Sequence, residues 1–310
     1  MILRYHAVAE NADYCPASIA VTPAMFDRQM AYLAARYTVI GMDEVADRLA
    51  DNAPFPPNAV CVTFDDGYLD NCEVAAPILA RHGLTATFYC AAGPVLRGAR
   101  FWVSWVHERV ARCADPRPLA HAFGVATDDA RGLRARLSHR LLTAFATSDT
   151  DGWPPLYERI AAQLAPAERA GLPSHAYMMQ ERHIRRLAEA GMTIGSHTVH
   201  HPILASVAEE RAEAELTAAR SMLEAAVRRS VQHLAYPNGP GPVRNFTART
   251  ESLAAAAGYR TGATSLRGSL VHGADAFALR RQGVNQALGF AGFAFKLEEH
   301  RFLGPIPAQE

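Results

Sequence analysis

Short β-rich runs alternate with amphipathic stretches along most of the chain, and this alternation restricts the possible folds more than any other feature. The run Ala59–Phe64 is almost continuously apolar, as expected for a strand that is buried on both faces of a sheet. An amphipathic stretch follows at residues 70–82 and ends at Gly83. Strands that alternate with helices pair in parallel, so the sequence predicts an α/β fold with a parallel sheet, open or closed into a barrel.

The same reasoning places the other elements. Strands are predicted near residues 2–8, 37–40, 85–91, 192–196, 233–236, Thr261 and Phe277, and helices at 23–36, 43–51, 181–190, 207–229, 247–257 and 288–297. Residues 98–175 are rich in Ala, Arg and Pro, include helix-like stretches such as 131–146, and contain no clear strand. We therefore predict a single domain over residues 1–310 that carries a helical insertion at about 98–175.

The composition excludes several classes of function. The 31 basic and 31 acidic side chains leave no net charge, which argues against a nucleic-acid-binding protein. Lys296 is the only lysine, so the chain has no P-loop, and its one candidate for Schiff-base chemistry lies near the C-terminus. The five cysteines form no Cys-x-x-Cys pair and are expected to be reduced. We expect a cytoplasmic protein, because no run reaches the roughly 20 apolar residues of a membrane span and the chain opens without a signal-peptide pattern.

Two adjacent carboxylates follow the apolar strand in the sequence Thr-Phe-Asp-Asp-Gly-Tyr, residues 63–68. The carboxyl ends of parallel strands form the active face of α/β folds. Asp65 and Asp66 would repel each other there unless a cation separated their roles, with one carboxylate binding a metal and the other accepting a proton. The alternative is an Asp-Asp-Gly turn whose acids only cap the next helix.

A second polar sequence, Gly-Ser-His-Thr-Val-His-His-Pro at residues 195–202, also follows a predicted strand. In a helical turn, positions i and i+4 share a face, which would let His197 and His201 bind one metal. One carboxylate with two histidines leaves positions open for water and substrate, as in a catalytic rather than a structural site. An incidental pair of histidines is the alternative.

Together the two motifs resemble those of the polysaccharide deacetylases, the NodB-homology domain of carbohydrate esterase family 4. The resemblance runs from Ile2 to about Asn285. It implies a distorted (β/α) barrel with about seven strands and a divalent metal, usually zinc, as cofactor. The metal ligands that it implies are Asp66, His197 and His201, with Asp65 as the general base. The family spacing His-Thr-x-x-His selects His201 rather than its neighbour His200.

Three further site residues follow from the resemblance. Tyr236, in Tyr-Pro-Asn-Gly, matches the third family motif, whose backbone N–H after a strand helps to hold the oxyanion; a plain turn is the alternative. The opening Leu-x-Tyr-His resembles that of a permuted subgroup and makes His6 the candidate general acid; a solvated or packing histidine is the alternative. The arginine that steadies the base elsewhere is missing from the third motif, and Arg281 is our substitute, with Arg280 as its rival and a surface charge as the alternative.

The resemblance implies removal of an N-acetyl group from an amino sugar in a saccharide. A deformylase or cyclic amide hydrolase would share every residue named, and an inactive glycan-binding protein is the alternative from another class. In the insertion, Phe101, Trp102, Trp105 and Trp153 either provide a sugar platform or pack as core. If the insertion covers the barrel mouth, it would favour a short or terminal sugar over the middle of a long polymer. The sequence does not indicate an oligomeric state.

Overall fold

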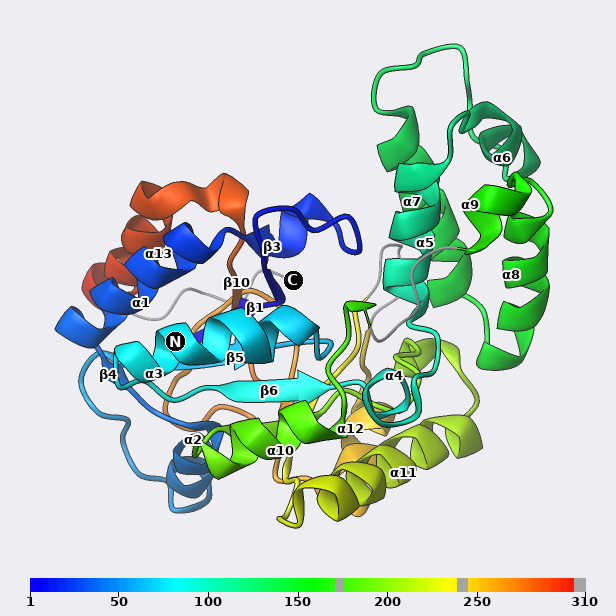
Figure 1. Cartoon of the computed structure of the whole chain (residues 1–310). Helices are drawn as coiled ribbons and strands as arrows, with labels where there is room; N and C mark the ends of the chain where they lie inside the picture. Colours follow the sequence, from blue (N-terminus) through cyan, green and yellow to red (C-terminus); the bar gives the residue numbers. More distant parts are fainter. Residues whose placement is uncertain (171–175, 239–244, 304–310) are drawn as a thin grey trace.

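A curled sheet of parallel strands forms the centre of the molecule (Figure 1). The computed structural model describes residues 1–170, 176–238 and 245–303. The strands pair in the order β10, β1, β5, β6, β7, β8, β9, and β4 pairs with the first residues of β5. Their bounds are β1 Ile2–Tyr5, β4 Thr38–Val39, β5 Ala59–Phe64, β6 Thr87–Cys90, β7 Thr193–Ser196, β8 His233–Ala235, β9 Thr261–Ala263 and β10 Gln282–Gly283. This arrangement confirms the predicted distorted (β/α) barrel.

One segment near the C-terminal end, residues 279–283, contacts both ends of the curled sheet. Leu279 forms a parallel bridge with Ala263 at the end of β9, and β10 pairs with β1. The strand predicted near Phe277 is wrong by a few residues. The reason is a local turn, in which the backbone N–H of Phe277 donates to the side chain of Asp275 at 2.8 Å.

Helices cover the outside of the sheet (Figure 1). Their bounds are α1 Pro23–Arg36, α2 Met42–Ala50, α3 Ala76–Arg81, α10 Glu181–Glu189, α11 Glu209–Val227, α12 Ala248–Ala256 and α13 Gly289–Leu303. The predicted cap is confirmed at α1, where the Thr22 hydroxyl accepts the N–H of Met25 at 3.3 Å. The helix predicted at 70–82 begins instead as a π-helical turn over Asn71–Ala75 and continues as α3. No helix in the described ranges is long and apolar enough to cross a membrane.

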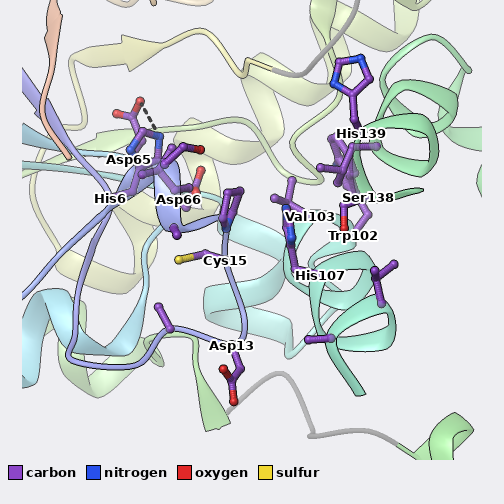
Figure 2. Close-up of a pocket in the computed structure, with 18 of the residues that line it drawn as sticks. His6, Asp13, Cys15, Asp65, Asp66, Trp102, Val103, His107, Ser138 and His139 are labelled. Atoms are coloured by element: carbon purple, nitrogen blue, oxygen red, sulfur yellow. Dashed lines mark ion pairs between the residues drawn. The ribbon is translucent and has the colours of Figure 1, made fainter. Parts of the chain in front are cut away.

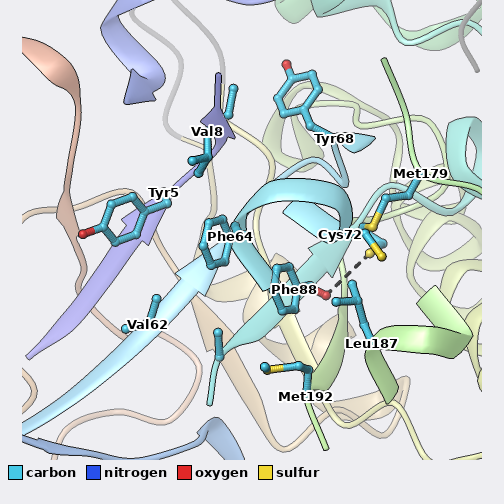
Figure 3. Close-up of a cluster of buried hydrophobic side chains, with 14 of the residues drawn as sticks. Tyr5, Val8, Val62, Phe64, Tyr68, Cys72, Phe88, Met179, Leu187 and Met192 are labelled. Atoms are coloured by element: carbon cyan, nitrogen blue, oxygen red, sulfur yellow. Dashed lines mark hydrogen bonds between the residues drawn. The ribbon is translucent and has the colours of Figure 1, made fainter. Parts of the chain in front are cut away.

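Packing between the sheet and α1 decides which side chains point to the inner face. The rings of Tyr5 and Phe64 lie 5.5 Å apart at the ends of β1 and β5, and both contact Phe26 of α1. Figure 3 shows Tyr5 and Phe64 in the same buried cluster as other residues of this layer. Successive side chains of a strand point to opposite faces, so the next residues, His6 and Asp65, are directed away from this layer.

The chain between β6 and α10 forms helices joined by loops, and its only strand-like contact in the described ranges is an isolated bridge between Met178 and Tyr68. Its helices are α4 Ala92–Arg97, α5 Trp102–Arg112, α6 Arg117–Ala122, α7 Leu133–Ala146, α8 Trp153–Ala161 and α9 Pro166–Ala170, and residues 171–175 of the predicted insertion lie outside the described ranges. Helices α5 to α9 form a group beside the barrel (Figure 1). The aromatic residues considered as a sugar platform, Phe101, Trp102, Trp105 and Trp153, are all buried and pack in the core, and Trp102 also borders the cavity described below.

Candidate active site

The two adjacent carboxylates lie at the carboxyl end of β5, in a turn that separates their partners. Asp66 has a backbone φ of +77° and Gly67 one of +93°. A Cβ atom at position 67 would lie 2.9 Å from Val95, so this tight turn requires glycine. Both aspartates are buried, at 3 % exposure each. Because the turn directs them to different neighbours, Asp65 contacts an arginine and Asp66 contacts two histidines.

Asp66, His197 and His201 lie close enough to bind one ion. The Nε2 atoms of both histidines lie 3.4 Å from Asp66 Oδ1. One candidate ligand atom from each residue falls within 4.8 Å of the other two. The structure therefore brings together the three residues predicted as metal ligands.

A turn, rather than the helical turn that the i, i+4 spacing suggested, brings the two histidines together. Residues 197–203 are not helical, and Thr198 and His201 adopt left-handed backbone conformations with φ of +64° and +62°. The helical interpretation of this spacing was wrong. The neighbouring His200 is turned to another partner, since its Nδ1 lies 2.7 Å from Glu215 Oε1.

The donor set suits a divalent metal. His197 donates its Nδ1–H to the carbonyl of Ala235 at 2.7 Å, which leaves the lone pair of Nε2 directed at Asp66. Burial lowers the pKa of His201, which favours the neutral ring that a metal ligand must have. Burial alone would raise the pKa of Asp66, but the two imidazoles beside it lower it well below its usual range. Two imidazoles and one carboxylate therefore face the same point.

Arg281 holds the other carboxylate. Its two terminal nitrogens each lie 2.7 Å from one oxygen of Asp65, and its Nε donates to the carbonyl of Thr264 at 2.8 Å. The rival Arg280 donates to the carbonyl of Arg267 instead. Burial alone would raise the pKa of Asp65, but the Arg281 guanidinium lowers it to about 2. Asp65 is therefore ionised at neutral pH.

His6 lies between β1 and β2 (Ala7–Val8), beside the same carboxylate. Its Nε2 is 4.0 Å from Asp65 Oδ2, and its side chain is 14 % exposed. Burial lowers the pKa of His6 to about 4, although the charges of Asp66 and Asp65 oppose this shift. The imidazole is therefore neutral near pH 7.

Tyr236 cannot supply the predicted oxyanion contact. Its backbone N–H donates to the carbonyl of Ala263 at 2.9 Å, as part of the sheet. Its ring is buried and stacks on Phe246. The next residue, Pro237, has no N–H, so the first later residue with one is Asn238, which lines the cavity described below. Pro237 was the sequence signal that the free N–H belongs to Asn238 rather than to Tyr236. Gly239 of the motif lies outside the described ranges.

A cavity of about 910 Å³ opens onto these residues (Figure 2). Its walls come from the strand ends with Asp65, Asp66 and the two histidines, from residues between 10 and 19, and from helices α5 and α7. Figure 2 shows His107 of α5 and His139 of α7 across the cavity from His6 and Asp65. The site is thus open to a ligand of several rings, and the helical group supplies its far wall.

Comparison with known proteins places the chain in a family. The family model described as polysaccharide deacetylase matches residues 52–114 and 149–262. The chain belongs to the polysaccharide deacetylase family. The matched segments include Asp65, Asp66, His197 and His201, whereas His6 and Arg281 lie outside them. Membership identifies the protein as a hydrolase of the carbon–nitrogen bond of an amide.

The similar proteins found by comparison have low sequence identity to this chain. YxkH of Bacillus subtilis (strain 168), which is assigned by name to the polysaccharide deacetylases, is 18 % identical over 298 residues, 96 % of this chain and 75 % of YxkH. The Streptococcus pyogenes deacetylase PplD in complex with acetate has a TM-score of 0.61 at 18 % identity and covers 96 % of both chains. IcaB from Ammonifex degensii has a TM-score of 0.61 at 17 % identity, covering 97 % of this chain and 96 % of its own. The two structures show that the fold is shared.

Proposed function

We propose that this protein removes the N-acetyl group from an amino sugar of a saccharide, as a zinc-dependent enzyme with Asp65 as its general base. The observation that carries the proposal is the pairing of two different carboxylate environments at one cavity. Asp66 faces two imidazoles at 3.4 Å, and Asp65 is held by Arg281 at 2.7 Å. Such a pair separates a metal-binding carboxylate from a proton-accepting one.

Asp66, His197 and His201 would hold the ion. When bound, a divalent cation supplies Lewis-acid chemistry, since it polarises a carbonyl oxygen and lowers the pKa of a water ligand. Asp65 accepts the proton of the attacking water, and Arg281 fixes the direction of its oxygens through two hydrogen bonds. A carboxylate with a pKa of about 2 is a weak base, so it binds the proton only briefly.

His6 completes the proton path in this proposal. A ring with a pKa of about 4 is neutral at pH 7 and has no proton to give at the start of the reaction. It can receive the proton from Asp65, whose pKa is lower, across the 4.0 Å that separates Nε2 and Oδ2 in this structure. His6 would then protonate the leaving amine, so that acetate and a free amino sugar result.

The oxyanion is assigned to a different residue from the one that the sequence suggested. We propose the backbone N–H of Asn238, because the N–H of Tyr236 is committed to Ala263 and Asn238 lines the cavity. The side chain of Asn238 accepts a hydrogen bond from Asn245 Nδ2, which fixes the position of Asn238.

Acetate release from a panel of N-acetylated sugars, oligomers and polymers with added zinc tests the function. We expect acetate from at least one saccharide, with short or terminal sugars preferred because α5 and α7 wall one side of the cavity. Formate or a ring-opened acid in place of acetate would indicate another amide hydrolase. Glycan binding without any acid product would indicate a binding protein. Activity confined to long polymers would refute the length preference alone.

A further inference from the structure

The turn that joins the two histidines has a backbone shape that its sequence does not favour. Thr198 and His201 both lie in the left-handed region, with φ of +64° and +62°. This region is uncommon for residues other than glycine and especially so for a β-branched threonine. Surrounding contacts must therefore hold the turn in place.

An account of the polar backbone groups shows which contacts hold the turn. The N–H groups of Val199 and His200 both donate to Glu215 Oε2, at 2.9 Å each. The N–H of His201 donates to the Thr198 hydroxyl at 3.0 Å. On the opposite side, the carbonyls of residues 198 and 199 accept the N–H groups of residues 92 and 93, each at 2.9 Å. Glu215 is thus the one side chain that binds both N–H groups in the middle of the turn.

Glu215 is a buried carboxylate with a full set of partners. It lies on α11, with 2 % of its surface exposed. Its second oxygen, Oε1, lies 2.7 Å from His200 Nδ1 and 3.5 Å from the Arg211 guanidinium. Burial of a carboxylate is costly unless such partners are present. Glu215 is not in the group of candidate metal ligands found among the described residues.

We propose that Glu215 is a positioning residue for the metal centre. By accepting two N–H groups of the turn, it fixes the backbone shape that directs His197 Nε2 and His201 Nε2 to within 3.4 Å of Asp66. The inference rests on the proposed function, because it requires that these three residues bind a metal. In this role, the length of the Glu215 side chain matters more for metal binding than its negative charge.

Metal affinity of substituted proteins tests the proposal. Zinc dissociation constants are measured by competition with a chelating dye on metal-stripped protein, and the visible absorption of the Co²⁺-loaded protein reports ligand geometry. We expect Glu215→Ala and Glu215→Asp to weaken zinc binding about 10- to 100-fold, because neither side chain reaches the turn. Glu215→Gln keeps a carbonyl oxygen at full length, so we expect binding within about threefold of wild type and an unchanged Co²⁺ spectrum.

Two controls separate this role from general stabilisation. Glu224→Ala removes another carboxylate of α11, which accepts the N–H of Val231 at 3.1 Å and pairs with Arg220, and it should leave zinc affinity unchanged. His200→Ala removes the imidazole partner of Glu215 but keeps both N–H contacts, and it should also bind zinc normally. An equal loss of affinity in Glu224→Ala would overturn the proposal.

The remaining outcomes are also decisive. If Glu215→Ala does not fold, the proposal is tested by comparing Glu215→Asp with Glu215→Gln. The Asp variant shortens the side chain, whereas the Gln variant keeps its length and removes its charge. Zinc binding by Glu215→Asp equal to wild type, or a loss in Glu215→Gln as large as in Glu215→Asp, would overturn the role of Glu215 alone. A wild-type protein that binds neither zinc nor Co²⁺ would overturn the proposed metal site as well.

Discussion

Two adjacent residues of the same type acquire different chemistry here because their neighbours differ. Asp65 lies against a guanidinium, which keeps it ionised and fixed in direction. Asp66 lies against two imidazoles, of which one is oriented by a backbone carbonyl. The covalent structure of the two side chains is identical, so the difference in role comes from burial and contacts alone.

Substitution of each aspartate should separate metal binding from proton transfer. We expect Asp66→Ala to lose both zinc and activity, because it removes the one anionic group of the three predicted ligands. We expect Asp65→Asn to retain stoichiometric zinc and to lose about 10²- to 10⁴-fold in rate, the usual contribution of a positioned base. Metal analysis and acetate release on the same samples check this. Zinc retained in a His197→Ala/His201→Ala double variant would contradict the ligand assignment.

The Arg281 contact predicts a change in pH dependence. Because the guanidinium lowers the pKa of Asp65, its removal in Arg281→Gln should raise that pKa. As the proposed base, Asp65 would be active only when ionised, so we expect the acidic limb of the kcat/KM profile to move to higher pH. The matched control is Arg280→Gln, which removes a guanidinium bound to the carbonyl of Arg267 and should leave the limb in place. An unmoved limb in Arg281→Gln would show that another group titrates there.

At the scale of elements, the spacing of apolar residues predicted where most strands and helices lie. It did not predict the backbone hydrogen bonds of the residues that follow the strands. Strand Ala59–Phe64 and helix Pro23–Arg36 have their predicted bounds. The same sequence patterns could not show that the N–H of Tyr236 pairs with Ala263, because that contact depends on which strand lies beside β8. The four-residue spacing of His197 and His201 likewise suggested a helical turn. In the structure, a turn with left-handed residues, which donates two N–H groups to Glu215 of α11, brings the two imidazoles equally close.

Helix α5 carries a partly buried imidazole that should make stability depend on pH. Burial lowers the pKa of His107 to about 4, from the usual value of 6.5. Between these values the unfolded chain binds more protons than the folded one, so the free energy of unfolding should fall as pH falls from 6.5 to 4. In His107→Gln this loss should be smaller by about 2 kcal/mol. Urea unfolding of wild type and His107→Gln at pH 7 and pH 4.5 measures the fall in the free energy of unfolding of each protein.

The control for this prediction is an imidazole of the same cavity with a different environment. His139 of α7 also lines the cavity but is exposed, so His139→Gln should change the pH dependence little. An identical pH dependence in wild type and His107→Gln would mean that the imidazole of His107 is hydrated in solution.

At the scale of the whole molecule, the site exists only when distant parts of the chain meet. The ends of β1, β5 and β7 bring His6, the aspartates and His197 to one mouth, and the chain just before β10 adds Arg281. The motifs predicted this meeting because carboxyl ends of parallel strands share an edge. The far wall, from α5 and α7, was not predictable, since helical periodicity says nothing of where an insertion docks.

A site assembled from distant segments is absent from the unfolded chain, so zinc should stabilise the folded protein. At a free concentration 100 times the dissociation constant, the gain is about 2.7 kcal/mol, which should raise the midpoint of thermal unfolding by several degrees. A chelator should reverse the rise, and Asp66→Ala should show none. His233→Ala is the control, because it removes a buried histidine paired with Asp43 at the amino end of β8 and should keep the rise. An equal rise in Asp66→Ala would locate the stabilising ion elsewhere.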